Sequence, residues 1–328
     1  MSHLNFKTRF LIIISVFIIS SIIIVFSFLN YLKVDRTKLN NVETKNINDS
    51  EFLNKTWNEL FEGKSIEQSI TLIKTLKFMI KNVDEYDPEL IEFVKSLIEL
   101  PASSSKLNLR KTKLNNNDYS QFGQSSYVSD KLLMNKTNGF FIESGAYDGE
   151  DLSNTLYFEL NLNWTGLLIE PIPFLYEKLL AKNRNIFALN ACIAKNKPIL
   201  AKFRVFHALS GREDQMGEMH RNIINDGISG LDEKYKIEYM PCFSINTIMK
   251  ALDVKQVDFF SLDIEGGEWD VINSIHFDHL NIKSFCIEWT GNENNKYLII
   301  EHLNKNGFNL VKSTDFDLFF LKNNDSKF

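Results

Sequence analysis

The 328-residue chain has few of the residues that build metal centres and disulfide frameworks, with only three cysteines and six histidines. The cysteines show no paired metal-ligand spacing, and the histidines show no spacing typical of a known site. There is no G-x-S-x-G sequence and no P-loop, so hydrolase, zinc and NTPase interpretations have no support. A formal net charge of −5 without a basic stripe argues against a nucleic-acid partner. The sequence therefore predicts neither a metal site nor nucleic-acid binding.

One long apolar run is present near the N-terminus. Phe10–Leu29 is a stretch of 20 residues without a charge, which matches a hydrocarbon core about 30 Å thick. A cleavable signal peptide has a shorter core and small residues at its cleavage site, and Asn30–Lys33 offers no such site. We therefore expect a single-pass membrane anchor, preceded by a short tail of residues 1–9.

The orientation of this span is ambiguous. Lys7 and Arg9 precede it, but four basic residues follow it closely, so the positive-inside count leans towards a cytosolic domain. Five N-x-S/T sequons suggest the lumen, yet about four are expected by chance in a chain so rich in asparagine, serine and threonine. The basic residues after the span are Lys33, Arg36, Lys38 and Lys45, and the sequons begin at Asn48, Asn54, Asn135, Asn163 and Asn324.

Residues 30–120 are interpreted as a linker and a helical stalk. The segment 33–50 is rich in asparagine and lysine, which is typical of a flexible linker. Apolar residues in the segment 65–100 recur at helical spacing and predict two short helices. Pro88 suits the first turn of the second helix, and Asp87 suits its N-cap. The expected apolar faces are Ile66, Ile70, Ile73, Leu76 and Ile80, then Leu90, Ile91, Val94 and Leu97.

Residues 121–328 are expected to form one α/β domain. Strand-like and helix-like segments alternate, which predicts a mostly parallel sheet with helices on both faces. Two final strands joined by Ser313–Asp315 predict an antiparallel ending, and the middle of the domain is expected to be irregular. The expected strands are 139–143, 166–170, 186–193, 257–263, 284–289, 307–312 and 316–321, and the expected helices are 151–161, 173–183, 244–252, 268–275 and 293–305.

The segment Phe140–Glu150 carries the most informative pattern. It predicts a buried strand ending in Glu143, a tight turn containing Gly145 and the start of a helix, a geometry that holds nucleotide-like ligands. Glycine at position 145 lets backbone approach a ligand closely, and Gly149 permits either an unusual φ or close helix packing. The spacing E-x-G-x-x-x-G differs from the G-x-G-x-x-G of dinucleotide-binding folds.

Two further apolar strands end in acids. The sequence L-I-E-P places Glu170 at a strand end, where a carboxylate can accept both hydroxyls of a ribose. The strand 257–263 leads into a cluster of Asp263, Glu265 and Glu268. Carboxylates this close together repel each other, so they lie at a helix N-terminus, bind cations or have raised pKa values.

In this order, E-S-G-A-Y-D-G, L-I-E-P and L-D-I-E-G-G-E resemble the FkbM-type family of S-adenosylmethionine-dependent methyltransferases. With its N-terminal anchor, the chain resembles the membrane-anchored Star-like branch. The resemblance covers roughly residues 125–322. It implies a Rossmann-like class I methyltransferase fold, S-adenosylmethionine as cofactor and O-methyl transfer as the reaction, and it leaves the acceptor, a small molecule or a glycan, unassigned.

A cofactor site at the strand ends follows from this resemblance. Glu143 would orient the amino group of the cofactor, and Glu170 would hold its ribose. Asn190 lies where family members meet the adenine, although a backbone partner would equally satisfy an amide in an apolar strand. The full set of expected cofactor contacts is Glu143, Gly145, Ala146, Gly149, Glu170, Asn190 and Asp263.

Asp263 and Glu288 are the predicted catalytic residues. Asp263 is expected to line the methyl-transfer pocket, and Glu288, which ends the next strand, is expected to act as a base or to line that pocket. The polar segment 210–230 is expected to cover the acceptor or to form a surface loop. Because a sulfonium is already activated, alignment of the acceptor carries much of the catalysis.

The resemblance also implies a domain in the lumen of the endoplasmic reticulum or Golgi. There Cys192 and Cys242 can pair; otherwise both are separate buried thiols, as Cys286 is in either case. Two functions follow: a membrane-tethered methyltransferase, or a non-catalytic protein of the same fold that escorts membrane-protein cargo. The strand-end acids and Gly145 favour the first. A lumenal position favours the second, because the methyl donor is made in the cytosol.

Overall fold

The computed structural model describes residues 60–102, 106–110, 118–206, 209–217, 221–222, 235–289 and 293–323. The expected anchor, Phe10–Leu29, lies outside the described residues, as does the linker 33–50. Among the described residues, no helix has both the length and the apolarity needed to cross a membrane. The chain divides into two compact units, Met1–Val83 and Asp84–Phe328.

The first unit contains helix α3 (Ile66–Lys81), as the apolar spacing predicts. A capping box at its start joins the Ser65 hydroxyl to the Gln68 amide and the Gln68 side chain to the Ser65 amide. Of the expected apolar face, Leu76 is buried and Ile73 is half-buried, but the other three residues are exposed, because α3 carries apolar residues on several sides and spacing alone does not select one. The buried residues are Leu72, Thr75, Leu76 and Phe78.

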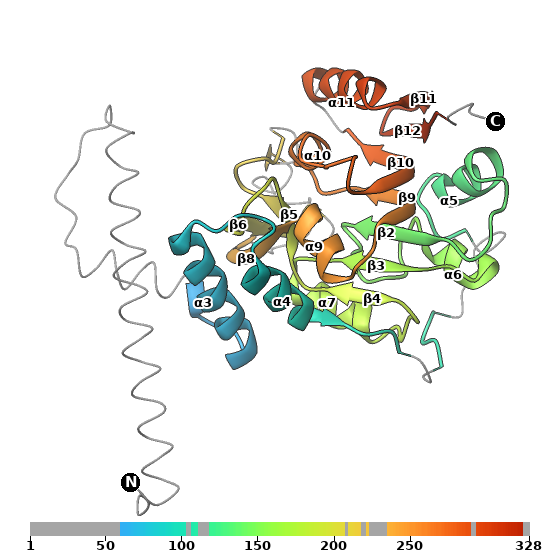
Figure 1. Ribbon diagram of the computed structural model, residues 1–328. Helices are drawn as coiled ribbons and strands as arrows, with labels where there is room; N and C mark the ends of the chain where they lie inside the picture. Colours follow the sequence, from blue (N-terminus) through green and yellow to red (C-terminus); the bar gives the residue numbers. More distant parts are fainter. Residues whose placement is uncertain are drawn as a thin grey trace, which may run out of the picture. The chain divides into compact units, whose positions relative to one another are not determined.

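The second unit is built, within its described residues, on an eight-stranded sheet of order β1-β4-β3-β2-β9-β10-β12-β11 (Figure 1). The strands β4, β3, β2, β9 and β10 are parallel to one another. At the edges, β1 runs antiparallel to β4, β12 to β10, and β11 to β12. The predicted parallel sheet with an antiparallel ending is confirmed. The strands are β1 (Ile98–Glu99), β2 (Phe140–Ser144), β3 (Thr165–Ile169), β4 (Phe187–Leu189), β9 (Gln256–Leu262), β10 (Asn281–Glu288), β11 (Phe308–Ser313) and β12 (Asp317–Lys322).

Helices cover both faces of this sheet, and Figure 1 shows α6 and α9 on opposite sides. Phe259 faces α6, where its ring lies 5.3 Å from that of Phe158. The next residue, Phe260, faces the other side and pairs with Phe285 of β10, as the alternation of a strand requires. The helices are α4 (Pro88–Leu97), α5 (Gln124–Tyr127), α6 (Leu156–Leu162), α7 (Pro173–Leu180), α9 (Ile245–Ala251), α10 (Glu268–Ile272) and α11 (Glu293–Lys305), with a π-helix, η2 (Val128–Leu132), after α5.

The expected single strand 186–193 is wrong, because the chain changes sheets within it. After β4, Asn190 turns the chain by donating to the carbonyls of Glu170 and Pro171, at 2.8 and 3.1 Å. The chain then enters a second sheet, of described order β5-β8-β6-β7, where an irregular middle was expected. Pro241 inside one of its strands obscured the pattern. These strands are β5 (Cys192–Ala194), β6 (Ile199–Val205), β7 (Gly211–Arg212) and β8 (Lys236–Ser244).

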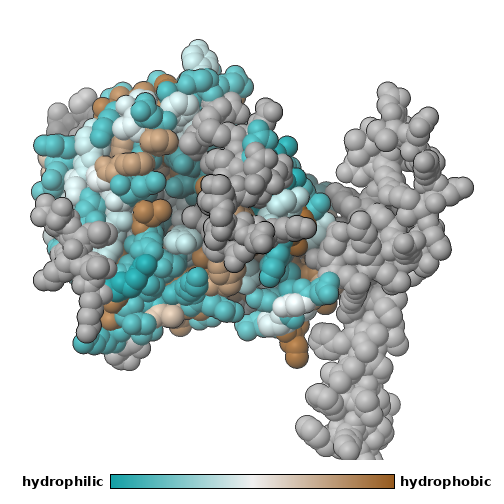
Figure 2. All heavy atoms as spheres, turned by 180° about the vertical axis from the view of Figure 1, so that it is seen from behind, coloured by the Kyte–Doolittle hydropathy of each residue, from teal (hydrophilic) through white to brown (hydrophobic). Residues whose placement is uncertain are grey.

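The unit that contains the sheet also includes residues 84–99, which were expected to belong to the stalk. Asp87 caps α4 by accepting from the Leu90 amide (3.1 Å), and Pro88 occupies the first turn, both as expected. Leu90 and Val94 are buried, and β1 pairs with β4 at the edge of the sheet. Figure 2 shows one face of the molecule, where hydrophobic residues form small groups among hydrophilic ones, as is usual for a protein surface.

The strand order creates a switch point beside β2. From β2, the chain proceeds to β3 and β4 on one side, then crosses to β9 and β10 on the other. Adjacent connections leave in opposite directions there, and ligands of open α/β sheets bind at the carboxyl ends of such strands. The fold therefore places the acids that end β2, β3, β9 and β10 around one crevice.

Candidate active site

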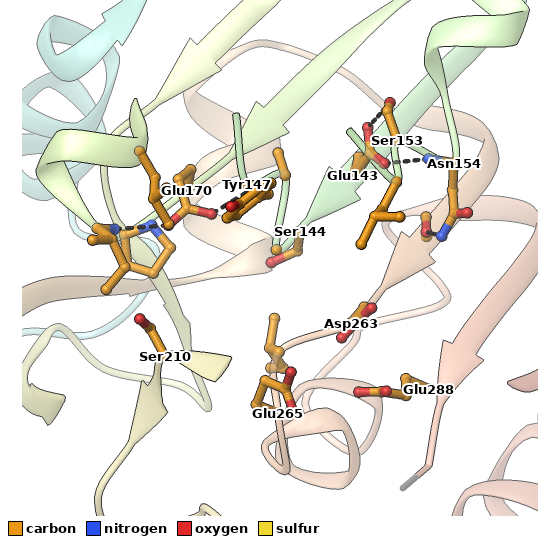
Figure 3. Close-up of a pocket in the computed structure, with 18 of the residues that line it drawn as sticks. Glu143, Ser144, Tyr147, Ser153, Asn154, Glu170, Ser210, Asp263, Glu265 and Glu288 are labelled. Atoms are coloured by element: carbon orange, nitrogen blue, oxygen red, sulfur yellow. Dashed lines mark hydrogen bonds between the residues drawn. The ribbon is translucent and has the colours of Figure 1, made fainter. Parts of the chain in front are cut away.

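A cavity of about 350 Å³ lies at the carboxyl ends of β2, β3, β9 and β10 (Figure 3). We call the parts of its wall contributed by these strand pairs the β2–β3 side and the β9–β10 side. Most of the predicted site residues line the cavity, but Gly149 and Asn190 do not. The predicted residues that line it are Glu143, Gly145, Ala146, Glu170, Asp263 and Glu288.

The loop after β2 is fixed against the end of β9. Gly145 has a φ of +82°, and a Cβ at this position would lie 1.7 Å from the carbonyl oxygen of Asp263. The Asp263 amide in turn donates to the Ser144 carbonyl, at 3.1 Å. Glycine is therefore required by a contact between two strand ends, in addition to the expected approach of a ligand, which stays a prediction. Ala146 is buried in the same wall, and its amide donates to Ile169 (3.2 Å).

Gly149 and Asn190 support the loops around the cavity. Gly149 has a φ of +77°, and a Cβ there would lie 3.0 Å from the Leu179 side chain on α7. Both roles that were expected of Gly149, an unusual φ and close helix packing, are thus observed. The Asn190 amide group donates to the main chain at Glu170 and Pro171. Of its two expected partners, the backbone is the one that the structure shows.

Glu143 organises the segment that precedes α6. One carboxylate oxygen accepts from the Asn154 amide (2.6 Å), and the other accepts from the hydroxyls of Ser153 (2.9 Å) and Thr155 (2.5 Å). These bonds hold residues 153–155 outside the helix, so the helix expected to begin at residue 151 begins at Leu156. Burial raises the pKa of Glu143, and Arg184, 3.9 Å away, opposes the rise.

Asn154 is a site residue that sequence reasoning missed. Its amide nitrogen donates to the Ser261 hydroxyl (2.9 Å), which joins the loop after β2 to strand β9. Its Oδ1 is buried without a hydrogen-bond partner in the described part of the chain, and the residue lines the cavity. The expected helix from residue 151 concealed it, because a helical asparagine is usually a surface residue. An orphaned acceptor in a cavity wall is suited to a ligand donor.

Glu170 holds two loops at the end of β3. Its oxygens accept from the amides of Tyr147 (2.9 Å) and Ile172 (2.8 Å), and the residue is only 4% exposed. Burial raises the pKa of Glu170 to about 8, and the two backbone hydrogen bonds oppose the rise. The carboxylate lines the cavity as expected, and its hydrogen bonds also hold the loops after β2 and β3 in place.

Three acids crowd the β9–β10 side. Asp263, Glu265 and Glu288 each offer a carboxylate oxygen within 4.8 Å of the others. Burial and the neighbouring acids raise the pKa of Glu265 to about 9 and that of Glu288 to about 12. Sequence reasoning placed Glu268 in this cluster instead of Glu288, because Glu288 is distant in sequence and only the pairing of β9 with β10 brings it here. Oxygen sets of this kind suit hard cations or hydroxyl donors.

Glu268 instead supports the start of α10. Its Oε1 accepts from the amides of Ile264 (3.0 Å) and Gly266 (3.1 Å). Burial raises its pKa to about 7, against the effect of these hydrogen bonds. The expected helix N-terminus is therefore the correct explanation for Glu268.

An aromatic pair flanks the β9–β10 side. The rings of Phe122 and Phe316 stack 5.2 Å apart at 9°, and the side chains line the cavity although the residues are 58% and 43% exposed. The segment that carries Phe122 is fastened by a hydrogen bond from Gln124 to Asp317 (3.0 Å). Sequence reasoning did not find this pair, because its two rings are brought together only by the sheet.

Apolar residues and a disulfide close the β2–β3 side. The wall there includes Ile193, together with Ile172, Leu175 and Phe203, which belong to a buried cluster. Cys192 and Cys242 form a disulfide, which is one of the two expected states, and Cys286 is a buried free thiol.

Acidic side chains outnumber basic ones around the cavity. Arg212 is the one cationic side chain among the described lining residues, and it already binds Asp214 at 2.7 and 3.1 Å. Arg212 and Ser210 come from the segment that was expected to cover an acceptor. A ligand group with positive charge would favour the ionised forms of these acids, whose pKa values burial raises at Glu143, Glu170, Glu265 and Glu288. The acids are Glu143, Asp151, Glu170, Asp263, Glu265 and Glu288.

Solved structures show likenesses at low sequence identity. A methyltransferase from Pyrococcus furiosus is 13% identical, over 71% of this chain and 96% of its own, with a TM-score of 0.32. Methyltransferase FkbM from Methylobacillus flagellatus KT is 13% identical, over 83% and 60%, with a TM-score of 0.35. Aeropyrum pernix fibrillarin, with natively bound S-adenosyl-L-methionine, is 12% identical, over 67% and 85%, with a TM-score of 0.36. At these TM-scores the likenesses carry no argument about this chain.

The sequence comparison is more decisive. No curated protein matches the chain. The family model of the methyltransferase FkbM domain matches residues 143–310, just over half of the 328 residues. The match starts at Glu143 and contains the ends of β2, β3, β9 and β10, and S-adenosylmethionine is the methyl donor expected of such a domain. The chain therefore belongs to the methyltransferase FkbM domain family.

Proposed function

We propose that this member of the FkbM methyltransferase family transfers the methyl group of S-adenosylmethionine to a hydroxyl oxygen of a small-molecule or glycan acceptor. The observation that carries the proposal is the position of Glu170. It is a buried carboxylate, held by two backbone amides, in the wall of a cavity at the switch point of the sheet. An acid at the end of the second strand of such a sheet binds ribose hydroxyls in nucleotide-binding folds.

The β2–β3 side fits this cofactor. Each oxygen of Glu170 accepts one backbone hydrogen bond, which leaves acceptor capacity for ribose hydroxyls. The apolar wall around Ile172 and Ile193 suits an adenine ring. The orphaned Oδ1 of Asn154 suits the amino group at the methionine end, and Glu143 holds Asn154 in place. When bound, S-adenosylmethionine supplies a methyl group on an activated, positively charged sulfur, which suits the acidic wall.

On the β9–β10 side, Asp263 and Glu288 receive the acceptor. Burial and the nearby carboxylates raise the pKa of Glu288 to about 12, so this group keeps its proton at neutral pH and donates a hydrogen bond. Asp263 then accepts the proton that the acceptor hydroxyl loses. Phe122 and Phe316 provide an apolar surface beside these acids for the rest of the acceptor.

Isothermal titration of the full-length chain with S-adenosylmethionine and S-adenosylhomocysteine tests the cofactor. We expect both to bind at one site and to compete with each other. The variant Glu170→Gln should weaken binding, whereas Glu293→Gln, which changes an exposed acid on α11, should not. A folded chain that gives no heat of binding at millimolar ligand would contradict the proposal.

We also propose that Phe10–Leu29 anchors the chain in the endoplasmic reticulum or Golgi membrane and that the second unit faces the lumen. The disulfide between Cys192 and Cys242 supports this orientation, because disulfides persist in oxidising compartments. The basic residues after the span favour the opposite orientation. Protease treatment of intact microsomes decides: protection of the domain supports the lumen, and digestion down to the anchor contradicts it.

The same disulfide favours a second candidate function, a non-catalytic role in moving membrane-protein cargo out of the endoplasmic reticulum. S-adenosylmethionine is made in the cytosol, so a lumenal domain has a poorer supply of it. This candidate predicts a folded, lumenal chain that binds no cofactor. The titration therefore separates the two functions.

A further inference from the structure

The Cys192–Cys242 disulfide fastens a short strand in the cavity wall. Cys192 begins β5, Cys242 lies in β8, and the two are partners in the parallel pairing of these strands. Their Cα atoms are 4.3 Å apart, although 50 residues separate them in sequence. β5 has three residues and stands at the edge of its sheet. The bond thus adds a covalent restraint to a buried edge strand that pairs with one neighbour, β8.

One of the two cysteines of this disulfide, Cys192, faces the cavity. Cys242 is fully buried, whereas Cys192 is 6% exposed and lines the cavity beside Ile193. Both cysteines otherwise pack in a buried cluster that includes Ile172 and Phe203. The cavity is therefore the route by which we expect a reagent to reach the sulfur of Cys192.

The strand is also connected to Glu170. Just before β5, Asn190 donates to the carbonyls of Glu170 and Pro171. Ile172 donates its amide to the Glu170 carboxylate (2.8 Å) and packs in the same cluster as Cys192. A displacement of Cys192 therefore acts on the groups that hold Glu170.

We propose that this disulfide is a redox modification site, reduced through the cavity by a small dithiol, and that its state sets the affinity for the cofactor. The second part rests on the proposed function. In the reaction, a thiolate of the dithiol attacks the Cys192 sulfur, the S–S bond breaks, and Cys242 leaves as a thiolate that takes up a proton. The second thiol then releases Cys192, so two electrons and two protons pass to the protein and the dithiol becomes a cyclic disulfide.

Reduction changes the wall because two non-bonded sulfur atoms cannot approach as closely as bonded ones. Either β5 and β8 separate or the Cys192 side chain turns into the cavity. A bound cofactor, in turn, covers Cys192 and restrains β5. By thermodynamic linkage, the disulfide favours cofactor binding to the same extent that the cofactor favours the disulfide.

The first test is the rate at which dithiothreitol reduces the full-length chain, with and without saturating S-adenosylhomocysteine. Samples are quenched, denatured and alkylated, and thiols are counted by intact mass, from one (Cys286) to three. We expect the ligand to slow the reduction about tenfold or more. An unchanged rate at a concentration where titration shows the ligand bound would overturn the proposal.

The second test needs no cofactor. Dithiothreitol is compared with the same dithiol coupled to a large polymer that cannot enter the cavity. Fast reduction by the small reagent alone supports access through the cavity, and equal rates would overturn it. If the chain binds no S-adenosylhomocysteine but shows this size dependence, the proposed function fails and the modification site stands.

Variants test the effect on affinity. Cys286→Ser is the matched control, since it leaves the disulfide pair as the only cysteines and should bind and reduce like the unchanged chain. The double variant Cys192→Ser, Cys242→Ser imitates the reduced form. We expect it to bind S-adenosylhomocysteine about tenfold more weakly than the oxidised chain, without response to reductant. If the double variant has an unchanged circular dichroism spectrum and binds the ligand as tightly as the oxidised chain, the proposal that the disulfide sets the affinity is overturned.

Discussion

The two sides of the cavity use carboxylates in opposite ways. On the β2–β3 side, Glu143 and Glu170 accept hydrogen bonds from protein groups on both of their oxygens. On the β9–β10 side, Asp263, Glu265 and Glu288 bring their oxygens close to one another. All of these groups lie at strand ends in one cavity, so the difference comes from what faces each carboxylate.

The β2–β3 acids face backbone amides and hydroxyls of the loops that follow β2 and β3. Each acid is held in position, and each loop is held by its acid, which is the preorganisation that a fixed ligand needs. The β9–β10 acids face each other, so burial and the neighbouring acids raise the pKa values of Glu265 and Glu288. That side is satisfied by protons or by a ligand that brings hydroxyl donors or positive charge. The comparison indicates a constant ligand on one side and an exchangeable one on the other.

The largest expected effect comes from breaking the contact between the two sides. Gly145→Ala places a Cβ 1.7 Å from the Asp263 carbonyl, at a φ of +82°. Strain and collision together should lower the free energy of unfolding by about 3–5 kcal/mol, as measured by urea unfolding. Gly307→Ala is the control, because Gly307 has the same φ but no atom within 4 Å of the added Cβ, and it should cost about 1 kcal/mol. Equal costs would show that the collision is relieved easily.

The second prediction concerns the β2–β3 side. Glu170→Gln presents an amide group, which cannot accept, to one of the two backbone amides of Tyr147 and Ile172. S-adenosylhomocysteine affinity should fall by roughly ten- to a hundredfold, which corresponds to about 1.5–3 kcal/mol, with a smaller loss of stability.

The unchanged chain should also bind S-adenosylhomocysteine more tightly as the pH rises from 6 to 9. Ribose hydroxyls favour the ionised form of Glu170, and its pKa in the folded chain is about 8. The Glu170→Gln variant should lose this dependence. Titrations at three pH values measure both effects, and a retained pH dependence would assign it to another group.

The third prediction concerns the β9–β10 side, where stability should fall as the pH rises. The folded pKa of Glu288 is about 12 against 4.5 for the ordinary group, so the folded chain keeps a proton that the unfolded chain releases above pH 4.5. Stability is therefore lost as the pH rises above 4.5, up to the folded pKa. Glu288→Gln removes this loss and should raise the free energy of unfolding by about 1–2 kcal/mol at pH 8, with little effect at pH 4.5.

Urea unfolding at the two pH values, with Glu293→Gln as an exposed control, measures this difference. A Glu288→Gln variant that is destabilised equally at both values would show that the acid cluster is held by donors after all. The acids of the β9–β10 side would then be held by hydrogen-bond donors in the same way as those of the β2–β3 side.

The smallest effect is expected at the aromatic pair. Phe122→Leu removes a partly exposed ring stack with Phe316 and should cost about 0.5 kcal/mol of stability. S-adenosylhomocysteine affinity should change less than twofold, because the pair lies on the β9–β10 side. A larger loss, measured by titration, would mean that the cofactor extends across both sides of the cavity.

Sequence and structure agree where the signal is local. The strand ends at Glu143 and Glu170, the capped helix after Asp87 and the terminal antiparallel pair were all predicted from neighbouring residues. Disagreement begins where a side chain binds a distant backbone. Asn190 divides one expected strand into two, and Glu143 delays the start of α6, in each case through hydrogen bonds that sequence spacing does not show.

The alternation of strands and helices, the acids at the strand ends and the family could all be predicted from the residues, because they depend on periodicity and on residue types in a fixed order. Which acids meet depends on the fold. The pairing of β9 with β10 brings Glu288 to Asp263, and the pairing of β5 with β8 brings Cys192 to Cys242. Such neighbours follow from the order of strands in a sheet, and strand order is a property of the whole fold that no local pattern of residues encodes.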